Sequence, residues 1–494
     1  MSKTQRSILL TGILIIAIFL RFYHFTTTPP GLYPDEAMDG NNAAEVAETS
    51  HFQVFYPEDN GREGLYVNII AVFLKVWPIY EPWVVRLPAA VAGVLTVWGL
   101  YLLVAELFGN GPGLLAAFLL ATSFWGIIFS RIGFRAILAP LALIFTLWLM
   151  LKAFRSANKR MALLFAALAG IIYGLGFYTY IAYRVTPILF LLFIPFFRKL
   201  PDFWKRTSLF IVATFIVAAP LGWYFSTTPG SFFGRTAEIS VTSASNPVHD
   251  LAVNVAKELL MFNYHGDYNW RQNVSGGPEL FWPVGILFLL GIVLSAYYAI
   301  RRWRKKYITA EDEKLFPEFG IFLAFAWFIF GILPAAASDE GIPHALRSIL
   351  GLAPALIFAT LGGIWLYRII EKHWSAALAK SLMAVFIIIL AGWGYYDYFV
   401  VWAQNPNVQG AFSTNYVDIG RQINALPTST PKYVVVNAGG VPVRGIPTPA
   451  ETTMFITHSF TDADAAAANI HYVLPDQTSS IPAGTPSADI FYID

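Results

Sequence analysis

The sequence predicts an α-helical polytopic membrane protein with a small α/β domain at its C-terminal end. Of its 494 residues, 56% are hydrophobic and only 13% are charged, about half the fraction of roughly 25% that is usual for soluble domains. Apolar runs recur through residues 1–402, whereas residues 403–494 show short strand patterns. The absence of cysteine excludes disulfides and thiol catalysis. The net charge of +2 gives no reason to expect a nucleic-acid partner.

About eleven runs reach, or nearly reach, the roughly 20 apolar residues that a spanning helix needs. In order they are Ser7–Phe25, Val85–Phe108, Pro112–Phe129, Ile132–Leu151, Met161–Thr179, Val185–Phe197, Thr207–Phe225, Leu280–Ile300, Phe316–Ala336, Leu346–Tyr367 and Ala376–Trp402. The sixth is short. The first follows two basic residues and lacks a small-residue cleavage site, so we expect a retained anchor rather than a signal peptide.

The distribution of Lys and Arg predicts the orientation of these spans in the cell membrane. With a cytoplasmic N-terminus, the basic clusters at 152–160, 198–206, 301–306 and 368–372 all fall in cytoplasmic loops. This holds only if the apolar stretch Leu65–Trp77 lies on the outer surface instead of crossing the membrane. The first loop (Thr26–Pro82), a long loop (Thr228–Glu279) and the tail from Ala403 then face outward.

The tail has the pattern of a small extracytoplasmic α/β domain over residues 403–494. Its predicted strands are Tyr433–Asn437, Thr453–Thr457, Ile470–Leu474 and Asp489–Ile493, which alternate with helix-like or loop segments. The long outer loop contains a predicted amphipathic helix around Asp250–Phe262. No tandem repeat is evident.

Several cationic side chains stand at the outer ends of the spans, where the positive-inside rule does not account for them. They are Arg86, Arg131, Arg135, Arg184, His344 and Arg347. The spacing predicts that Arg131 and Arg135 share a helix face. Each arginine alone is equally well explained by contact with lipid phosphates. As a group, they indicate a bound anionic headgroup.

The first loop supplies carboxylates. Asp35 and Glu36 follow Pro34, as is typical of a helix start. Neighbours on a helix point about 100° apart, so Asp35 can face the bundle while Glu36 binds another loop or a cation. A carboxylate beside a phosphate-binding cluster can act as a general base.

Other polar residues of the outer loops are candidates for ligand binding. Arg62, between Gly61 and Gly64, offers a guanidinium fork that suits phosphate, and Glu63 adds an acid. His265 and Asp267 could hold a divalent metal ion, although a lone histidine more commonly hydrogen-bonds a loop.

Four motifs resemble those of the GT-C superfamily of lipid-carrier-dependent glycosyltransferases. They are Pro34-Asp-Glu-Ala37, Asn60-Gly-Arg-Glu-Gly-Leu65, Arg86-Leu-Pro-Ala-Ala90 and Ser130-Arg-Ile-Gly-Phe-Arg135. The chain is most similar to the glycosyltransferase family 39-like group, which is related to protein O-mannosyltransferases and lipid A aminoarabinose transferases. The resemblance covers roughly residues 7–367. It implies a GT-C fold and inverting transfer of a sugar from a polyprenyl-phosphate donor to a hydroxyl of a protein, lipid or glycan acceptor at the outer membrane face.

The resemblance also implies roles for individual residues. Asp35 would be the base and Glu36 its acidic companion. The donor phosphate would be bound by Arg62, with Arg131 or Arg135 assisting. Apart from the resemblance, the residues themselves make Arg184 and Arg347 further candidates for the phosphate. They also make Glu63, Tyr66, Tyr180 and His344 candidates for contact with substrate, although interfacial tyrosines also form aromatic belts. Glu63-Gly64 departs from the prolines usual in the family, and Trp393-Gly-Tyr-Tyr-Asp-Tyr398 lies within a span, which disfavours an oligosaccharyltransferase.

Two other functions are compatible with so many spans. A transporter or flippase of an anionic lipid-linked substrate would place polar residues near mid-span and show inverted repeats, whereas the strong charges here collect at one face. A membrane anchor for the outer domain would not need so many spans.

Overall fold

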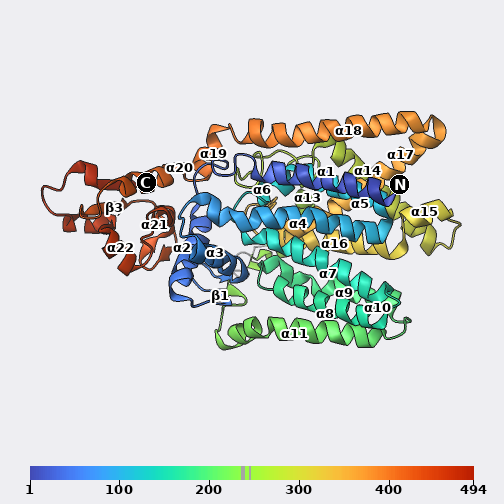
Figure 1. Cartoon of the computed structure of the whole chain (residues 1–494), viewed down its shortest axis with the longest axis horizontal. Coiled ribbons are helices and arrows are strands. Elements are labelled where there is room, and N and C mark those ends of the chain that lie inside the picture. Colours follow the sequence, from blue (N-terminus) through green and yellow to red (C-terminus); the bar gives the residue numbers. More distant parts are fainter. Residues whose placement is uncertain (235–239, 244–245) are drawn as a thin grey trace.

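The computed structural model describes residues 1–234, 240–243 and 246–494 and has a long helical bundle with a small domain at one end (Figure 1). Within the described residues, nine helical runs are long and apolar enough to cross a membrane. They are α1 (Lys3–Phe22), α4 (Pro82–Phe108), η1 with α7 (Arg135–Arg155), α8 (Lys159–Gly176), α11 (Phe203–Thr227), α14 (Trp282–Trp303), α16 (Glu318–Ala336), η4 with α17 (Ile349–His373), and α18 with the π-helix that continues it (Ala376–Trp402). All nine coincide with predicted spans.

The other two predicted spans are broken into shorter helices. The third is divided into α5 (Asn110–Thr122) and α6 (Phe124–Phe129), because Ser123 caps a new helix by accepting from the amide of Gly126. The sixth consists of η2 (Ile181–Val185), α9 (Pro187–Leu191) and α10 (Phe193–Phe197). Both run along the bundle with the long helices (Figure 1).

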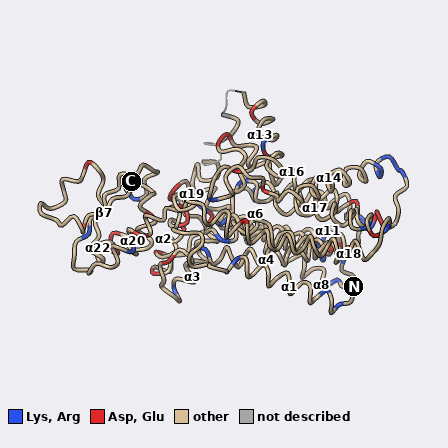
Figure 2. The backbone as a smooth tube through the Cα atoms, turned by 90° about the horizontal axis from the view of Figure 1, so that it is seen from above, with Lys and Arg blue, Asp and Glu red and all other residues tan. Residues whose placement is uncertain are grey.

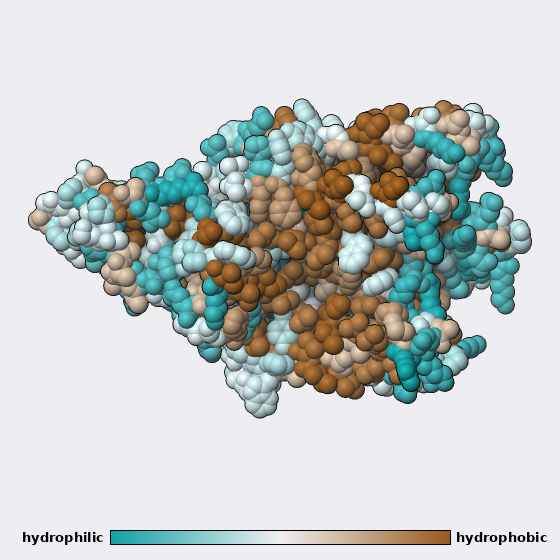
Figure 3. All heavy atoms as spheres, in the orientation of Figure 1, coloured by the Kyte–Doolittle hydropathy of each residue, from teal (hydrophilic) through white to brown (hydrophobic). Residues whose placement is uncertain are grey.

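The two ends of the bundle differ in charge and in attached structure. Figure 2 shows Lys and Arg gathered near the N-terminus and α15 (Ala310–Leu315), whereas α2 (Pro34–Thr49), α3 (Leu65–Val76) and the C-terminal domain lie at the opposite end. We call this opposite end the loop end. Between the polar ends lies a band of hydrophobic surface (Figure 3). Helix α3 lies beside α2 at the loop end (Figure 1); that this end is the outer surface stays a prediction.

The C-terminal region has the expected α/β character. Strands β3 (Lys432–Val436), β6 (Ile470–Val473) and β7 (Ile490–Ile493) form a parallel sheet in the order β6-β3-β7. The remaining elements include α19 (Pro406–Ala411), α20 (Thr414–Ala425), the hairpin of β4 (Pro442–Val443) and β5 (Ile446–Pro447), α21 (Glu451–Thr457) and α22 (Asp462–Ala468).

The strand predicted at Thr453–Thr457 is wrong, because these residues belong to α21. Their β-branched side chains favour a strand locally, but every residue of α21 is buried. The helix packs between α20 and α2. Burial on all sides outweighs the local preference. The amphipathic helix predicted in the long outer loop is present as α13 (Pro247–Met261).

Polar contacts attach the C-terminal domain to the first loop. Asn41 of α2 donates to both the backbone oxygen and the carboxylate of Glu451, at 3.0 and 2.7 Å. Arg444 pairs with Glu45 at 2.6 Å and with Glu58 at 2.9 Å. The domain thus braces helix α2, which carries Asp35 and Glu36 in its first turn.

Candidate functional site

A cavity of about 390 Å³ with both polar and apolar walls opens at the loop end of the bundle. Its walls come from the first loop, from η2, from the end of α16 and from the segment after α16. Six of the predicted site residues line it: Glu63, Arg135, Tyr180, Arg184, His344 and Arg347. We call this cavity the cationic pocket, because three arginines stand against one carboxylate among these six.

Glu63 joins two of these arginines. Its carboxylate accepts from Arg135 Nε at 3.1 Å and pairs with Arg184 Nη2 at 3.2 Å. The side chain of Glu63 is only 3% exposed, so water screens the pairs little. A tight turn places Glu63 here: Gly61 has φ +81°, and a Cβ at Gly64 would lie 2.3 Å from the carbonyl oxygen of Gln53.

The segment before η4 brings His344 and Arg347 to the pocket. Arg347 Nη1 donates to Ser338 Oγ at 2.7 Å and to the backbone oxygen of Glu340 at 2.9 Å. Two buried acids of the long outer loop hold the segment. Glu258 accepts from the amide of His344 at 2.9 Å, and Asp267 from the amide of Ala345 at 2.8 Å.

Asp267 therefore has a different role from the predicted metal ligand. Its other oxygen accepts from the amide of Asn269 at 2.7 Å, so both oxygens already have backbone donors. His265 is exposed and packs edge-on against Tyr264. In the described part of the chain, neither residue belongs to a group of three or more candidate metal ligands. The predicted pair is not supported as a metal site.

The buried acids of this loop predict a pH dependence of stability. Burial raises the pKa of Glu258 from 4.5 to about 7, that of Asp267 from 3.8 to about 6, and that of Glu279 well above 4.5. Because the folded-state values lie above the unfolded ones, their stabilisation is complete below pH 4 and is lost as the pH rises through 6 and 7. Each unit by which the folded-state pKa exceeds the unfolded-state pKa adds about 1.4 kcal/mol to the free energy of unfolding at low pH.

We therefore expect the melting temperature in detergent to fall between pH 5 and pH 8 at constant ionic strength. Glu258→Gln removes one titrating group and should flatten this dependence, so the difference between wild type and variant isolates the contribution of Glu258. An identical slope in both proteins would contradict the assignment.

Asp35 and Arg62 meet beside the pocket rather than within its lining. Arg62 Nη2 lies 3.7 Å from Asp35 Oδ1, and Arg62 also pairs with Asp39 at 3.3 Å and with Asp59. With three carboxylates around it and a side chain only 2% exposed, Arg62 has no donors directed at a phosphate. It fixes Asp35 instead, whose side chain is 44% exposed.

Asp39 and Asp59 were missed in the sequence. The signal for Asp39 was its position four residues after Asp35, which puts both on one face of α2. Burial raises the pKa of Asp39, and Arg62 counteracts this only in part. Asp59 lies in the turn before Arg62 with φ 47°, and no pattern in the sequence marked it.

Glu36 is a structural anchor rather than a companion to the base. Its carboxylate accepts from Arg86 Nε at 2.8 Å and Nη2 at 2.9 Å, and from the amides of Tyr33 and Gly133 at 3.1 and 2.6 Å. Glu36 is 0% exposed. It therefore ties α2 to α4 and to the loop after α6, and it has no access to substrate.

Arg131 is also committed to the fold. It is 0% exposed and donates to the backbone oxygens of Leu20, Tyr23, His24 and Thr28, the carbonyls at the end of α1. The expected helix face shared with Arg135 is wrong, because α6 ends at Phe129 and η1 begins at Arg135. The intervening turn sends the two guanidinium groups to different partners.

Tyr66 belongs to the core, not to a sugar site. It is 0% exposed and donates to the backbone oxygen of Val85 at 2.7 Å. We expect Tyr66→Phe to cost about 1 kcal/mol of stability through loss of one buried hydrogen bond, with no change in affinity for substrate. Thermal unfolding together with a binding assay checks this; weaker binding at unchanged stability would restore the substrate role.

A second cavity of about 520 Å³, which we call the apolar groove, adjoins the cationic pocket and shares two of its lining residues. It lies among α8, α9, α10 and α11 and is rich in aromatic side chains, including Phe154, Tyr173, Phe190, Phe193, Phe210 and Phe215. Arg184 and Phe232 line both cavities. Arg184 Nη1 donates to the backbone oxygen of Phe232 at 2.6 Å, so the guanidinium group is fixed where the two cavities meet. The part played by Phe232 had no signal in the sequence.

Comparison with known proteins supports the fold. Residues 65–223 match the model of the dolichyl-phosphate-mannose-protein mannosyltransferase family. No curated protein sequence matches the chain significantly.

Three solved structures are similar over nearly the whole chain. ArnT from Cupriavidus metallidurans bound to undecaprenyl phosphate has a TM-score of 0.55 at 13% identity, covering 100% of this chain and 90% of that one. The apo oligosaccharyltransferase of Archaeoglobus fulgidus has a TM-score of 0.58 at 15% identity, covering 92% of this chain and 64% of its own length.

The archaeal oligosaccharyltransferase AglB from Archaeoglobus fulgidus, in complex with an inhibitory peptide and a dolichol-phosphate, has a TM-score of 0.57 at 14% identity, covering 96% of this chain and 69% of that one. This chain therefore spans about two thirds of the archaeal enzyme and nearly all of ArnT. The likenesses show a shared fold, which confirms the resemblance to GT-C membrane proteins at that level.

Proposed function

We propose that this protein with a GT-C fold is an inverting glycosyltransferase of the cell membrane. It transfers a sugar from a polyprenyl-phosphate donor to an acceptor hydroxyl on a protein, lipid or glycan at the extracytoplasmic face. The observation that carries this proposal is that a cationic cavity and an apolar cavity adjoin at Arg184 and Phe232, which line both. A molecule with an anionic head and a long apolar tail fits both together.

The apolar groove accommodates the polyprenyl tail, whose transfer from water is favourable at about 25 cal/mol per Å² of buried area. The phosphate then lies in the cationic pocket near Arg135, Arg184 and Arg347. Glu63 neutralises one positive charge and keeps two of the arginines in place. The remaining positive charge is available to the phosphate.

The reaction needs stabilisation of the leaving phosphate and removal of a proton from the acceptor hydroxyl. Arginines already held by hydrogen bonds supply the first with little reorganisation. Asp35 removes the proton of the acceptor hydroxyl as general base, because its carboxylate is accessible and is kept in place by its pairing with Arg62. The acceptor approaches from the side of Asp35, opposite the donor phosphate, as inversion requires.

A transporter or flippase of an anionic lipid-linked substrate is the alternative. It would need a polar path through the membrane, whereas Arg135, Arg184 and Arg347 all stand at the loop end. The similarity to ArnT and AglB, described with undecaprenyl phosphate and dolichol-phosphate respectively, also favours sugar transfer.

The direct test is to incubate the purified protein with a panel of polyprenyl-phosphate sugars and candidate acceptors. We expect release of the free lipid phosphate, detected by mass spectrometry, together with a glycosylated acceptor of inverted anomeric configuration. Movement of intact lipid-linked sugar across proteoliposomes without release of lipid phosphate would replace this proposal with the transporter.

A further inference from the structure

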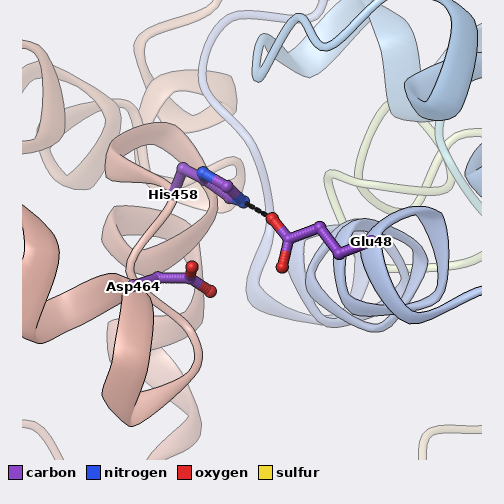
Figure 4. A group of neighbouring side chains, drawn as sticks. All are labelled: Glu48, His458 and Asp464. Carbon is purple, nitrogen blue, oxygen red and sulfur yellow. Dashed lines mark ion pairs between the residues drawn. The ribbon is translucent and has the colours of Figure 1, made fainter.

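Three side chains that bind metals in other proteins converge where the C-terminal domain meets the first loop. Glu48 lies near the end of α2, His458 directly follows α21, and Asp464 lies in α22 (Figure 4). Their ligand atoms all lie within 4.8 Å of one another. In the described part of the chain this is the single group of three such residues, and none of the three lines the cationic pocket.

The imidazole of His458 is oriented toward Glu48, and Asp464 lies nearby (Figure 4). Its Nε2 lies 2.7 Å from Glu48 Oε1, although the two atoms are not aligned as a hydrogen bond and Nε2 is sealed from solvent. The ring stacks on Tyr80 of the first loop, with centroids 4.0 Å apart and planes at 14°. Burial chiefly, and then the charges of Glu48 and Asp464, raise the pKa of Tyr80 to about 12.

Around Glu48, His458 and Asp464 the acidic side chains outnumber the basic ones, unlike at the other contacts between the C-terminal domain and the first loop. Elsewhere between the domain and the first loop, acids meet arginines: Glu45 and Glu58 pair with Arg444, and Glu81 pairs with Arg421. Asp464 accepts from Thr461 Oγ1 at 2.5 Å, and among the ion pairs of the described residues it has no Lys or Arg partner. His458 pairs with Glu48 alone, so a group of two carboxylates and one imidazole has an excess of negative charge.

We propose that Glu48, His458 and Asp464 bind a divalent transition-metal ion of the Zn²⁺ class, which fastens the C-terminal domain to helix α2. One imidazole nitrogen and two carboxylate oxygens are a donor set suited to Zn²⁺. They give a neutral complex with the dication and leave its fourth position to water. The proposal does not depend on the transfer activity inferred above.

The geometry requires only small side-chain movements. Tetrahedral bonds of about 2.0–2.1 Å place neighbouring ligand atoms about 3.3 Å apart. The Nε2–Oε1 pair would open from 2.7 Å, and the other separations, which lie below 4.8 Å, would close. Glu48 and His458 are 43% and 31% exposed, so their side chains can move apart to admit the ion to Nε2, which is closed to solvent in the present arrangement.

The site joins elements that are far apart in sequence. Glu48 stands on the same helix as Asp35, at its opposite end, and the ion would add a link to those formed by Asn41 and Glu451. Because a ligand that binds only the docked arrangement stabilises it by mass action, bound Zn²⁺ should raise the temperature at which the domain separates from the first loop.

The test uses the full-length protein in detergent after treatment with a chelator. Titration with ZnCl₂, followed by calorimetry and by thermal unfolding, should give one high-affinity site per chain and a higher melting temperature. We expect His458→Gln to weaken Zn²⁺ binding by more than about tenfold, because loss of a group that only supports a metal ligand already lowers metal affinity by about 10–100-fold. The same variant should abolish the thermal shift. Glu48→Gln, at an exposed position, is the second variant, in case loss of the histidine disturbs folding.

The matched control is His265→Gln, an exposed histidine outside the group, which should bind Zn²⁺ as the wild type does. Equal Zn²⁺ affinity of wild type, His458→Gln and Glu48→Gln would overturn the proposal, as would the absence of saturable binding by the wild type. Preference for Ca²⁺ or Mg²⁺ over Zn²⁺ would overturn the assigned class of metal.

Discussion

Replacing Asp35 by Asn is expected to abolish sugar transfer while leaving the protein folded and able to bind donor. The amide keeps the size of the side chain but cannot accept the proton of the acceptor hydroxyl, and loss of a general base typically costs about 10²–10⁴-fold in rate. Folding should be little affected, because the side chain is 44% exposed and Arg62 keeps Asp39 and Asp59 as partners.

The measurement is the rate of release of lipid phosphate under saturating donor, beside the melting temperature of each protein. Asp418→Asn, at an exposed position on α20, provides the same chemical change away from the site and should behave as wild type. Transfer by Asp35→Asn at the wild-type rate would show that another group accepts the proton.

The long spans could be predicted from the sequence because their physics is local. A run such as that of α4 must satisfy its backbone hydrogen bonds within itself in the membrane, so hydropathy alone identifies it. The break at Ser123 could not be seen in this way, since a single capping serine interrupts an otherwise apolar run. The helix at 453–457 failed for the opposite reason, because burial by α2 and α20 decides its conformation.

The candidate site shows the same difference between features that depend on local sequence and features that depend on distant contacts. Of the six outer-end cations expected to gather, four line one cavity, namely Arg135, Arg184, His344 and Arg347, whereas Arg86 and Arg131 do not. Arg131 is also an arginine at the outer end of a predicted span, yet its guanidinium group donates to carbonyls more than 100 positions earlier in the chain. Likewise, Glu36 and Asp35 are neighbours in sequence, but only the tertiary position of Arg86 shows which of them is buried. Partners so distant leave no mark on local patterns.

Replacing Arg184 by Ala is expected to have the largest effect on donor binding. Its guanidinium group stands at the junction of the cationic pocket and the apolar groove, where the phosphate and tail of the donor meet in our proposal. Removing one partner of a largely buried, charge-assisted contact costs about 2–5 kcal/mol, which corresponds to a loss of affinity of about 30-fold or more. Binding of polyprenyl phosphate in detergent at fixed salt measures this loss.

Variants at Arg184 also separate charge from geometry. Arg184→Lys retains the positive charge but loses the planar fork that pairs with Glu63 and donates to Phe232, so its affinity should lie between those of wild type and Arg184→Ala. Arg304→Ala, exposed at the opposite end of the bundle, should leave binding unchanged. Equal losses for Arg184→Ala and Arg304→Ala would indicate a general effect of net charge. Unchanged affinity in both variants would contradict the proposal that Arg184 binds the phosphate of the donor where the two cavities meet.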